Sequence, residues 1–115
     1  NRHNTNDGTC MRDFIHVSDL ASIHLKSLEL LNKKKKSFLI NCGYGKASSV
    51  LEIANLFKKN INKLTKINFK KARKGEIVLS YSNADKMKKI LNWKPKYNDI
   101  NLILKNAIKW ENKLK

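Results

Sequence analysis

The chain has 115 residues and a formal net charge of +16 at pH 7, from 25 Lys and Arg against 9 Asp and Glu. This length fits one domain, and a hydrophobic content of 41% supplies a core and argues against intrinsic disorder. The apolar runs are far shorter than the ~20 residues of a membrane span, and no basic-then-apolar leader opens the sequence. We therefore expect no membrane partner and no export signal.

The cysteines point to a reducing compartment. Cys10 and Cys42 are too few for a disulfide framework, and neither has a His or Cys at metal-ligand spacing beside it. We therefore expect a cytoplasmic protein with no metal site.

The positive charge raises the question of a nucleic-acid partner, because clustered cations gain affinity by releasing counterions from phosphates. The cations are 22 Lys and only 3 Arg, and the lysines are scattered through every segment. The only tight run, residues 33–36, lies between a predicted helix and a predicted strand, where a solvated loop is expected. We therefore expect no nucleic-acid partner, and a basic nucleic-acid-binding module is the non-enzyme alternative.

The first predicted elements are a short extended run at residues 14–17 and a helix that ends at the lysine run. Ser18 or Asp19 is expected to cap this helix. Its predicted apolar face consists of Ala21, Leu25, Leu28 and Leu31.

A second strand and helix follow. The strand is predicted at residues 37–41 and stops at a glycine turn, residues 43–45. Ser49 and Glu52 have the spacing of a capping box, in which each side chain satisfies a free backbone N–H of the other residue. This pair predicts that a helix begins at residue 50.

The last third predicts one more strand and two helices. Residues 66–70 alternate polar and apolar, which predicts a half-buried strand, and a turn follows at residues 73–76. Ser82 or Asn83 is expected to cap a short helix, and Asp99 a final one. The order strand, helix, strand, helix, strand, helix, helix predicts an α/β fold. The inward residues of the two helices are predicted to be Ala84, Met87, Leu91, Ile100, Ile103, Leu104, Ala107 and Ile108.

Three ring-bearing side chains are expected to have structural roles. A solitary His in an extended segment is more often packed or bonded to the backbone than catalytic, and this applies to His16. Trp93 and Trp110 are predicted to seal the core.

The segment at residues 7–21 is the most informative one. It combines a turn, an arginine, an extended run and a capped helix. Arg12 could project its planar, paired donors toward a diphosphate. On position alone, a surface ion pair of Arg12 with Asp13 or Asp19 is favoured.

This segment resembles the Asp-Gly-Thr-x-x-Arg-Asp-Tyr-Ile-His-Val-x-Asp-Leu-Ala signature of UDP-glucose 4-epimerases, which are extended short-chain dehydrogenase/reductase proteins. In family order, residues 40–51 resemble the Asn-Leu-Gly-x-Gly segment and the helix start after it. Residues 73–76 resemble the Arg-x-Gly-Asp turn, and residues 84–95 the closing helix and Trp-x-Pro segment. The resemblance covers essentially all of the chain. It implies that residues 1–115 are the C-terminal UDP-sugar-binding domain of an extended Rossmann-type enzyme, with short strands and about four helices.

The resemblance implies four substrate-binding residues. Arg12 is expected to contact the UDP pyrophosphate, and Val50 to line the uridine pocket. Arg73 is expected to grip the diphosphate, and Glu76 to bond a ribose hydroxyl. Two of the three arginines thus fall on phosphate positions. The chain departs from the family at three positions, which leaves its sugar specificity open: Glu76 stands for Asp, Phe14 for Tyr, and Ser80 for a sugar-side Tyr.

The resemblance further implies an isomerase of galactose metabolism that interconverts UDP-glucose and UDP-galactose through a 4-keto intermediate, with tightly held NAD. The chain contains neither a glycine-rich dinucleotide fingerprint nor a Tyr-x-x-x-Lys sequence. NAD and the catalytic groups are therefore expected in an N-terminal domain that this chain lacks. We expect no catalytic or cofactor-binding residue here, no activity of the fragment alone, and a homodimer at full length. Another nucleotide-sugar epimerase or a 4,6-dehydratase is the alternative enzyme.

Overall fold

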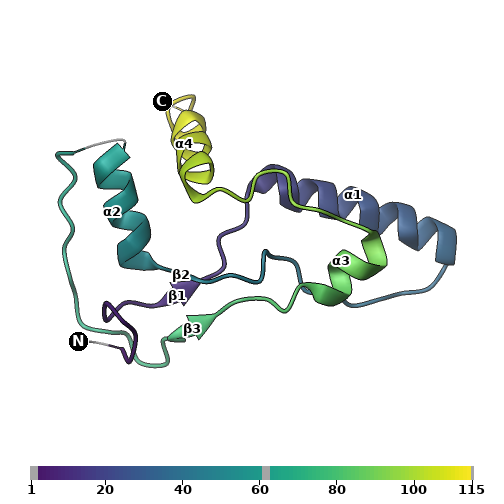
Figure 1. The fold of residues 1–115 in the computed structure, drawn as a ribbon, viewed down its shortest axis with the longest axis horizontal. Coiled ribbons are helices and arrows are strands. Elements are labelled where there is room, and N and C mark those ends of the chain that lie inside the picture. Colours follow the sequence, from purple (N-terminus) through teal and green to yellow (C-terminus); the bar gives the residue numbers. More distant parts are fainter. Residues whose placement is uncertain (1–2, 61–62, 115) are drawn as a thin grey trace.

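The computed structural model describes residues 3–60 and 63–114 and combines helices with a small sheet (Figure 1). Strands and helices follow one another in the predicted order, although the strands lie at other residues, and the short strands and four helices of the described residues confirm the predicted α/β class. The elements are β1 (Met11–Arg12), α1 (Val17–Lys34), β2 (Ser48–Ser49), α2 (Val50–Asn60), β3 (Leu79–Ser80), α3 (Asp85–Leu91) and α4 (Ile100–Glu111).

The central strand β1 brings together segments that are distant in the sequence. It pairs antiparallel with β2, with Met11 opposite Ser49, and parallel with β3, with Met11 opposite Leu79. Each strand has only two residues, so the sheet adds little to the core. Its main effect is to place the N-terminal loop, the start of α2 and the segment before β3 side by side (Figure 1).

The predicted strands at residues 37–41 and 66–70 are not part of this sheet, so both predictions were wrong. A compact apolar run, as at residues 37–41, or an alternating pattern, as at residues 66–70, forms a strand only where a sheet lies alongside to bury its apolar side chains. Here Leu39 and Phe69 remain 81% and 58% exposed. The first predicted strand is also displaced, because β1 precedes residues 14–17 and Val17 already belongs to α1.

The N-cap of α1 is His16, so the prediction that Ser18 or Asp19 caps the helix was wrong. The Nδ1 atom of His16 accepts a hydrogen bond from the Ser18 backbone N–H at 3.0 Å. The His16 ring is 4% exposed, lies 2.9 Å from the Asn106 side-chain amide and stacks on Tyr97. These contacts confirm that His16 is packed and bonded to the backbone.

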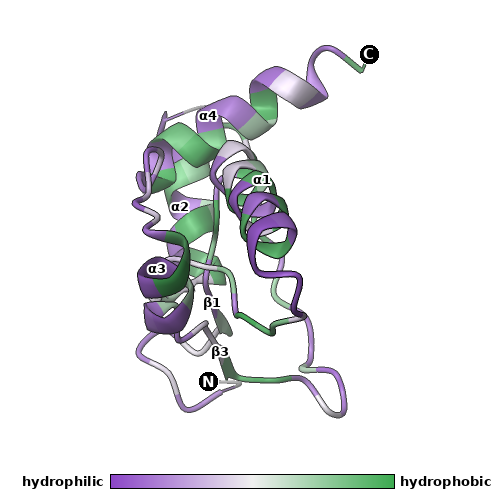
Figure 2. Cartoon of the chain, turned by 90° about the vertical axis from the view of Figure 1, so that its right-hand side faces the viewer, coloured by the Kyte–Doolittle hydropathy of each residue, from purple (hydrophilic) through white to green (hydrophobic). Residues whose placement is uncertain are grey.

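The buried face of α1 differs from the predicted one. Ile23 is 1% exposed and belongs to the core cluster, to which α3 contributes Met87 and Leu91. α1 carries both apolar and hydrophilic patches along its surface (Figure 2), and packing against α3 selects the Ile23 side. The apolar face predicted for α1 is exposed: Ala21, Leu25, Leu28 and Leu31.

No helix within residues 3–60 and 63–114 has the length and hydropathy to cross a membrane.

The core is built around α3, as predicted. Ala84, Met87, Leu91 and Trp93 are all buried. The Trp93 indole N–H also donates to the Ser22 hydroxyl at 2.8 Å, which joins the end of α3 to α1.

α4 contacts the core less than predicted. Ile103 is its residue packed against the core cluster, whereas Trp110 is 61% exposed. Trp110 lies two turns, about 10 Å, further along the helix, on the end of α4 that projects away from the rest of the chain (Figure 2). The prediction that Trp110 seals the core was therefore wrong. Of the other predicted inward residues, Ala107 is exposed, and Ile100, Leu104 and Ile108 are half-buried.

A buried carboxylate connects α1 to two loops. Asp19 is 1% exposed and accepts hydrogen bonds from the Tyr44 hydroxyl at 2.7 Å, the Lys96 N–H at 3.1 Å and the Tyr97 N–H at 3.0 Å. Burial, and then the hydrogen bond to Asp19, raise the pKa of Tyr44 to about 12. The phenol therefore stays protonated and continues to donate to Asp19 throughout the neutral range.

Two helix starts are capped as predicted, whereas the prediction that Ser82 or Asn83 caps α3 was wrong: the N-cap of α3 is Ala84, which makes no side-chain cap hydrogen bond. At α2, the Ser49 hydroxyl accepts from the Glu52 N–H at 3.0 Å, and the Glu52 carboxylate accepts from the Ser49 N–H at 3.3 Å. At α4, the Asp99 carboxylate accepts from the Asn101 N–H at 2.9 Å. The capping box confirms the expected start of α2 and fixes that helix against the end of β2.

We expect Ser49→Ala to lower the free energy of unfolding by about 1 to 2 kcal/mol, because it removes an N-cap acceptor. The same change removes the hydroxyl that donates to Asp7. Urea unfolding followed by circular dichroism measures the effect. Ser18→Ala, at an exposed position in the first turn of α1, is the matched control and should change stability by less than about 0.5 kcal/mol. Equal losses in the two variants would contradict the role of the capping box.

Candidate functional site

Asp7 ties the N-terminal loop to the start of α2. Its Oδ1 atom accepts from the N–H and the hydroxyl of Thr9 at 2.9 and 2.7 Å, and its Oδ2 atom accepts a short hydrogen bond from the Ser49 hydroxyl. The Thr9 hydroxyl accepts in turn from the Leu51 N–H at 3.1 Å. The hydrogen bond from Ser49, followed by those from Thr9, lowers the pKa of Asp7 below its ordinary value.

This lowered pKa predicts a loss of stability in acid. The folded chain holds Asp7 ionised, so its contribution is complete above the unfolded-state pKa of 3.8 and is lost as the pH falls through the lower folded-state value. Urea midpoints measured from neutral pH to below about pH 3 should therefore decline. Asp7→Asn cannot ionise and should decline less steeply; parallel curves for the two proteins would refute this linkage.

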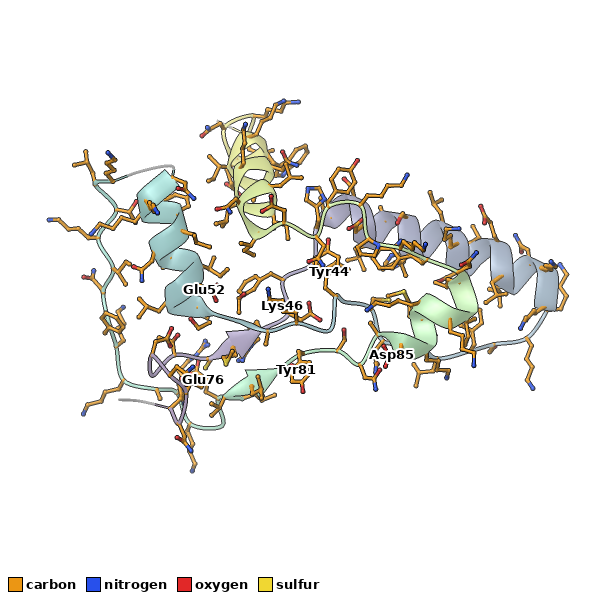
Figure 3. All side chains as sticks on the ribbon, in the orientation of Figure 1. Tyr44, Lys46, Glu52, Glu76, Tyr81 and Asp85 are labelled. Atoms are coloured by element: carbon orange, nitrogen blue, oxygen red, sulfur yellow. The ribbon has the colours of Figure 1, made fainter. Side chains whose placement is uncertain are left out.

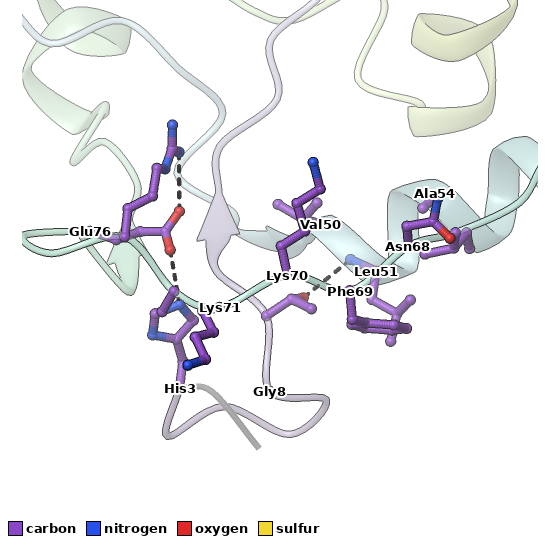
Figure 4. A pocket seen from close by; sticks show the side chains of 14 residues that line it. His3, Gly8, Val50, Leu51, Ala54, Asn68, Phe69, Lys70, Lys71 and Glu76 are labelled. Carbon is purple, nitrogen blue, oxygen red and sulfur yellow. Dashed lines mark hydrogen bonds and ion pairs between the residues drawn. The ribbon is translucent and has the colours of Figure 1, made fainter.

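A cavity of about 470 Å³ lies beside the start of α2 (Figure 4). The N-terminal loop contributes His3, Gly8 and Thr9 to its wall, and the turn before β3 contributes Arg73 and Glu76. The remaining lining residues come from α2 and from the segment that precedes the turn: Val50, Leu51, Ala54, Ile67, Asn68, Phe69, Lys70, Lys71 and Ala72.

Arg73 and Glu76 form an ion pair at one side of this cavity. The guanidinium donates to Glu76 Oε1 at 3.1 Å, and Glu76 Oε2 lies 3.3 Å from His3 Nε2 (Figure 4). The hydrogen bond from Arg73 is the main cause that holds the pKa of Glu76 below its ordinary value. The Arg73 side chain is 87% exposed and the Glu76 side chain only 20%. The pairing therefore positions a guanidinium that still faces solvent and can meet a second anion.

Arg12 points to backbone carbonyls and forms no ion pair with another described residue. Its guanidinium donates to the carbonyl oxygens of Ile77 at 2.6 Å, Met11 at 2.8 Å and Val78 at 3.4 Å. Neither Asp13 nor Asp19 is its partner, so the favoured surface ion pair was wrong. Arg12 instead connects β1 to the chain that immediately follows Glu76.

A second cavity, of about 530 Å³, contains Arg12 together with Asp13 and Ser80. Asp13 fixes the glycine turn beside this cavity, because its carboxylate accepts hydrogen bonds from the N–H groups of Tyr44 and Gly45 at 3.1 and 2.9 Å. Ser80, which stands where the resembled family has a Tyr, lies in the same cavity.

Gly43 is required for this arrangement. A Cβ atom at this position would lie 2.4 Å from an Asp13 carboxylate oxygen and 2.1 Å from the Ser82 hydroxyl. Ser82 itself donates to the same Asp13 oxygen at 3.0 Å. The glycine turn therefore approaches Asp13 as closely as it does only because residue 43 has no side chain.

The structure brings together three of the four sequence-predicted residues. Val50, Arg73 and Glu76 line the first cavity, and Arg12 lies in the second. Sequence reasoning missed the rest of the lining. Lys70 and Phe69 fall in the segment predicted to be a strand, and His3 lies in a loop with no motif. The basic composition of residues 70–74 was the one available signal, and the scattered lysines obscured it.

Comparisons with known proteins agree on one family. No protein-family model matches the chain. The UDP-glucose 4-epimerase of Azospirillum brasilense is 37% identical over 112 residues, which cover 97% of this chain and 32% of that protein. A UDP-arabinose 4-epimerase of Arabidopsis thaliana is 38% identical over 109 residues, 95% of this chain and 26% of that protein. The chain therefore spans about a third, or less, of the length of the curated relatives it matches.

Solved structures show the same relationship. The UDP-Glc/GlcNAc 4-epimerase of Campylobacter jejuni is 40% identical with a TM-score of 0.84, over 96% of this chain and 33% of that one. The UDP-glucose 4-epimerase of Stenotrophomonas maltophila, described with bound NAD and formylated UDP-arabinopyranose, is 31% identical with a TM-score of 0.89, over 97% of this chain and 33% of that one. By sequence and by fold, the chain is similar to the C-terminal portion of UDP-glucose 4-epimerases.

Proposed function

We propose that residues 1–115 form the UDP-sugar-binding domain of a UDP-glucose 4-epimerase. The complete enzyme interconverts UDP-glucose and UDP-galactose, with NAD held in the portion of the relatives that this chain does not span. The observation that carries the proposal is the single cavity shared by Val50, Arg73 and Glu76, in a chain homologous to 4-epimerases.

Each of these side chains suits one part of a uridine diphosphate. Arg73 offers an exposed guanidinium, whose planar donors match a diphosphate. Val50 is 48% exposed at the start of α2, next to Ala54, and gives an apolar wall against which the flat uracil ring can pack. Glu76 is a carboxylate that can accept a hydrogen bond from a ribose hydroxyl.

Arg12 is proposed as a second diphosphate ligand. Its contacts with described residues use three of its five N–H donors. The two remaining donors can bind an anion while the carbonyl contacts keep the side chain in place. Arg12 thus also fixes the position of the chain that carries Glu76, through the adjacent carbonyl of Ile77.

Contacts that hold the UDP group and leave the sugar free suit epimerisation at sugar C4. Bound NAD supplies a hydride acceptor and donor there. The sugar has to present both of its faces, so the firm contacts have to be made elsewhere on the substrate. Binding energy from the remote UDP group positions the reacting sugar without restraining its rotation. Arg12, Val50, Arg73 and Glu76 provide that firm end.

Turnover by the complete enzyme tests the proposal. The purified protein with its NAD should convert UDP-glucose to UDP-galactose. UDP-N-acetylglucosamine and UDP-arabinose are tested in parallel, because relatives act on other UDP-sugars by name. Release of a dehydrated sugar product would instead indicate a 4,6-dehydratase. Failure of all three epimerisations would contradict the proposal.

The same proposal includes the behaviour of the fragment and of the assembled enzyme. Residues 1–115 alone should show no turnover with added NAD, and activity of this fragment would place catalytic groups within it. The full-length enzyme is proposed to be a cytoplasmic homodimer. Light scattering and cell fractionation test this, and a monomer or an exported protein would contradict it.

A further inference from the structure

Three potential metal ligands meet at the edge of the first cavity. His3, Cys10 and Glu76 each offer one ligand atom, and these atoms all lie within 4.8 Å of one another. The His3 Nε2 and Glu76 Oε2 atoms are 3.3 Å apart. Cys10 is a free cysteine and 7% exposed, and the side chains of His3 and Glu76 are 10% and 20% exposed. The cluster is thus sheltered but reachable from the cavity.

The fold fixes these residues from three separate segments. The Cys10 carbonyl accepts from the Val50 N–H at 2.9 Å, at the junction between β1 and α2. The Glu76 N–H donates to the Arg73 carbonyl at 3.2 Å and closes the turn before β3. His3 reaches the cluster from the N-terminal loop. The spacing of the cysteines in the sequence gave no sign of a metal site, because only the pairing of β1 with its two neighbours brings these residues together.

The geometry matches a tetrahedral zinc ion. Zinc binds thiolate sulfur at about 2.3 Å and imidazole nitrogen or carboxylate oxygen at about 2.0 to 2.2 Å, so two of its ligand atoms lie about 3.3 to 3.7 Å apart. The separation of the His3 and Glu76 atoms already falls in this range. The Cys10 sulfur has to approach by up to about 1.5 Å, which small adjustments of its side-chain torsion and of the His3 loop can supply.

We propose that His3, Cys10 and Glu76 bind one Zn²⁺ ion at the edge of the cavity. The mixed sulfur, nitrogen and oxygen donor set is typical of zinc, and three protein ligands leave a fourth position for water. Binding requires the Cys10 thiolate, so it releases a proton. The Glu76 carboxylate is shared with Arg73, and the metal takes the oxygen that faces His3.

Co²⁺ titration of the full-length protein tests the site directly, because tetrahedral cobalt gives intense visible bands and its bond to sulfur a charge-transfer band. The wild-type protein should show both signals at one equivalent, and Zn²⁺ should abolish them. Cys10→Ser should remove the charge-transfer band, and His3→Ala should weaken Co²⁺ binding at least about tenfold. Cys42→Ser, at the other free cysteine, is the matched control and should keep both signals.

Absence of tetrahedral bands in the wild-type protein would overturn the proposal. So would loss of the sulfur signal in Cys42→Ser with retention in Cys10→Ser, because the metal would then be bound elsewhere. Circular dichroism establishes that each variant is folded. If Cys10→Ser does not fold, His3→Ala decides, because His3 lies in the N-terminal loop and outside the core cluster: unaltered Co²⁺ affinity in this variant contradicts the site.

The metal and the nucleotide share Glu76, and this last step rests on the proposed function. Saturating uridine, which has the ribose but lacks the cation-binding diphosphate of UDP, should lower the apparent affinity for Co²⁺ several-fold, because the ribose and the metal both require this carboxylate. Tight Co²⁺ binding that uridine does not affect would leave the metal site standing and contradict the proposed ribose contact of Glu76. If the wild-type protein binds UDP but not Co²⁺, the metal site is refuted and the proposed function is unaffected.

Discussion

Arg73→Ala is expected to weaken UDP binding by the complete enzyme about 10- to 100-fold. A hydrogen bond to a charged group contributes about 1.5 to 3 kcal/mol, and Arg73 offers a bidentate fork to the diphosphate. The guanidinium donates to Glu76 at 3.1 Å, and the Arg73 side chain is 87% exposed. Replacement should therefore remove binding energy without leaving a buried group unpaired. Calorimetric titration with UDP measures the effect.

Two variants separate a specific contact from loss of charge. Lys74→Ala removes one positive charge at the next, exposed position and should weaken binding less than about threefold, because exposed charges are screened by salt. Arg73→Lys keeps the charge and loses the planar fork, so it should fall between the wild-type protein and Arg73→Ala. Equal affinities for Arg73→Ala and the wild-type protein would remove Arg73 from the site. Equal losses for Arg73→Ala and Lys74→Ala would reduce its role to general electrostatics.

Asp19→Ala is expected to have the largest effect on stability, a loss of about 3 to 5 kcal/mol. The carboxylate is 1% exposed and accepts from the Tyr44 hydroxyl and from two backbone N–H groups, those of Lys96 and Tyr97. Its removal leaves the buried Tyr44 hydroxyl and two partly buried N–H groups without this acceptor, and a buried donor left unpaired costs about 1 to 3 kcal/mol. The same change separates α1 from the glycine turn and from the segment after α3.

Urea unfolding of the chain measures this loss. Asp19→Asn is the milder variant, because its amide oxygen still accepts from one side, and it should lose less than Asp19→Ala. Asp85→Asn, at an exposed position in the first turn of α3, is the control and should change stability by no more than about 1 kcal/mol. A loss below about 1 kcal/mol in Asp19→Ala would show that these donors find other partners.

Local signals in the sequence predicted the starts of α2 and α4 and the buried residues of α3. The Ser49–Glu52 capping box and the Asp99 cap depend on contacts between near neighbours, so their spacing is sufficient to identify them. Met87 and Leu91 follow from a short apolar repeat and are buried as expected. These features need no information about distant parts of the chain.

Features that depend on distant partners were not predictable in the same way. Residues 37–41 and 66–70 have strand patterns but no place in the sheet. The leucines of α1 have helical spacing, yet α3 packs against the Ile23 side. Asp19 has the sequence position of a helix cap, and its partners come from residues 44, 96 and 97. Burial in these cases is decided by tertiary contacts that local periodicity does not encode.

The candidate site likewise combines residues that motifs predict with residues that only tertiary contacts bring together. Arg73, Glu76 and Val50 were named from their positions in motifs, and the structure places them around one cavity. Arg12 was named in the same way and lies in the second cavity, bound to carbonyl groups. His3 and Cys10 carry no motif, and they reach Glu76 only because β1 lies between β2 and β3.

A crystal structure of the complete enzyme with UDP tests the central claim most directly. The proposal predicts that the diphosphate lies within hydrogen-bond distance of the Arg73 and Arg12 guanidinium groups. It also predicts that the uracil ring packs against Val50 and that a ribose hydroxyl donates to Glu76. UDP bound at a position where neither arginine reaches a phosphate oxygen would contradict the account.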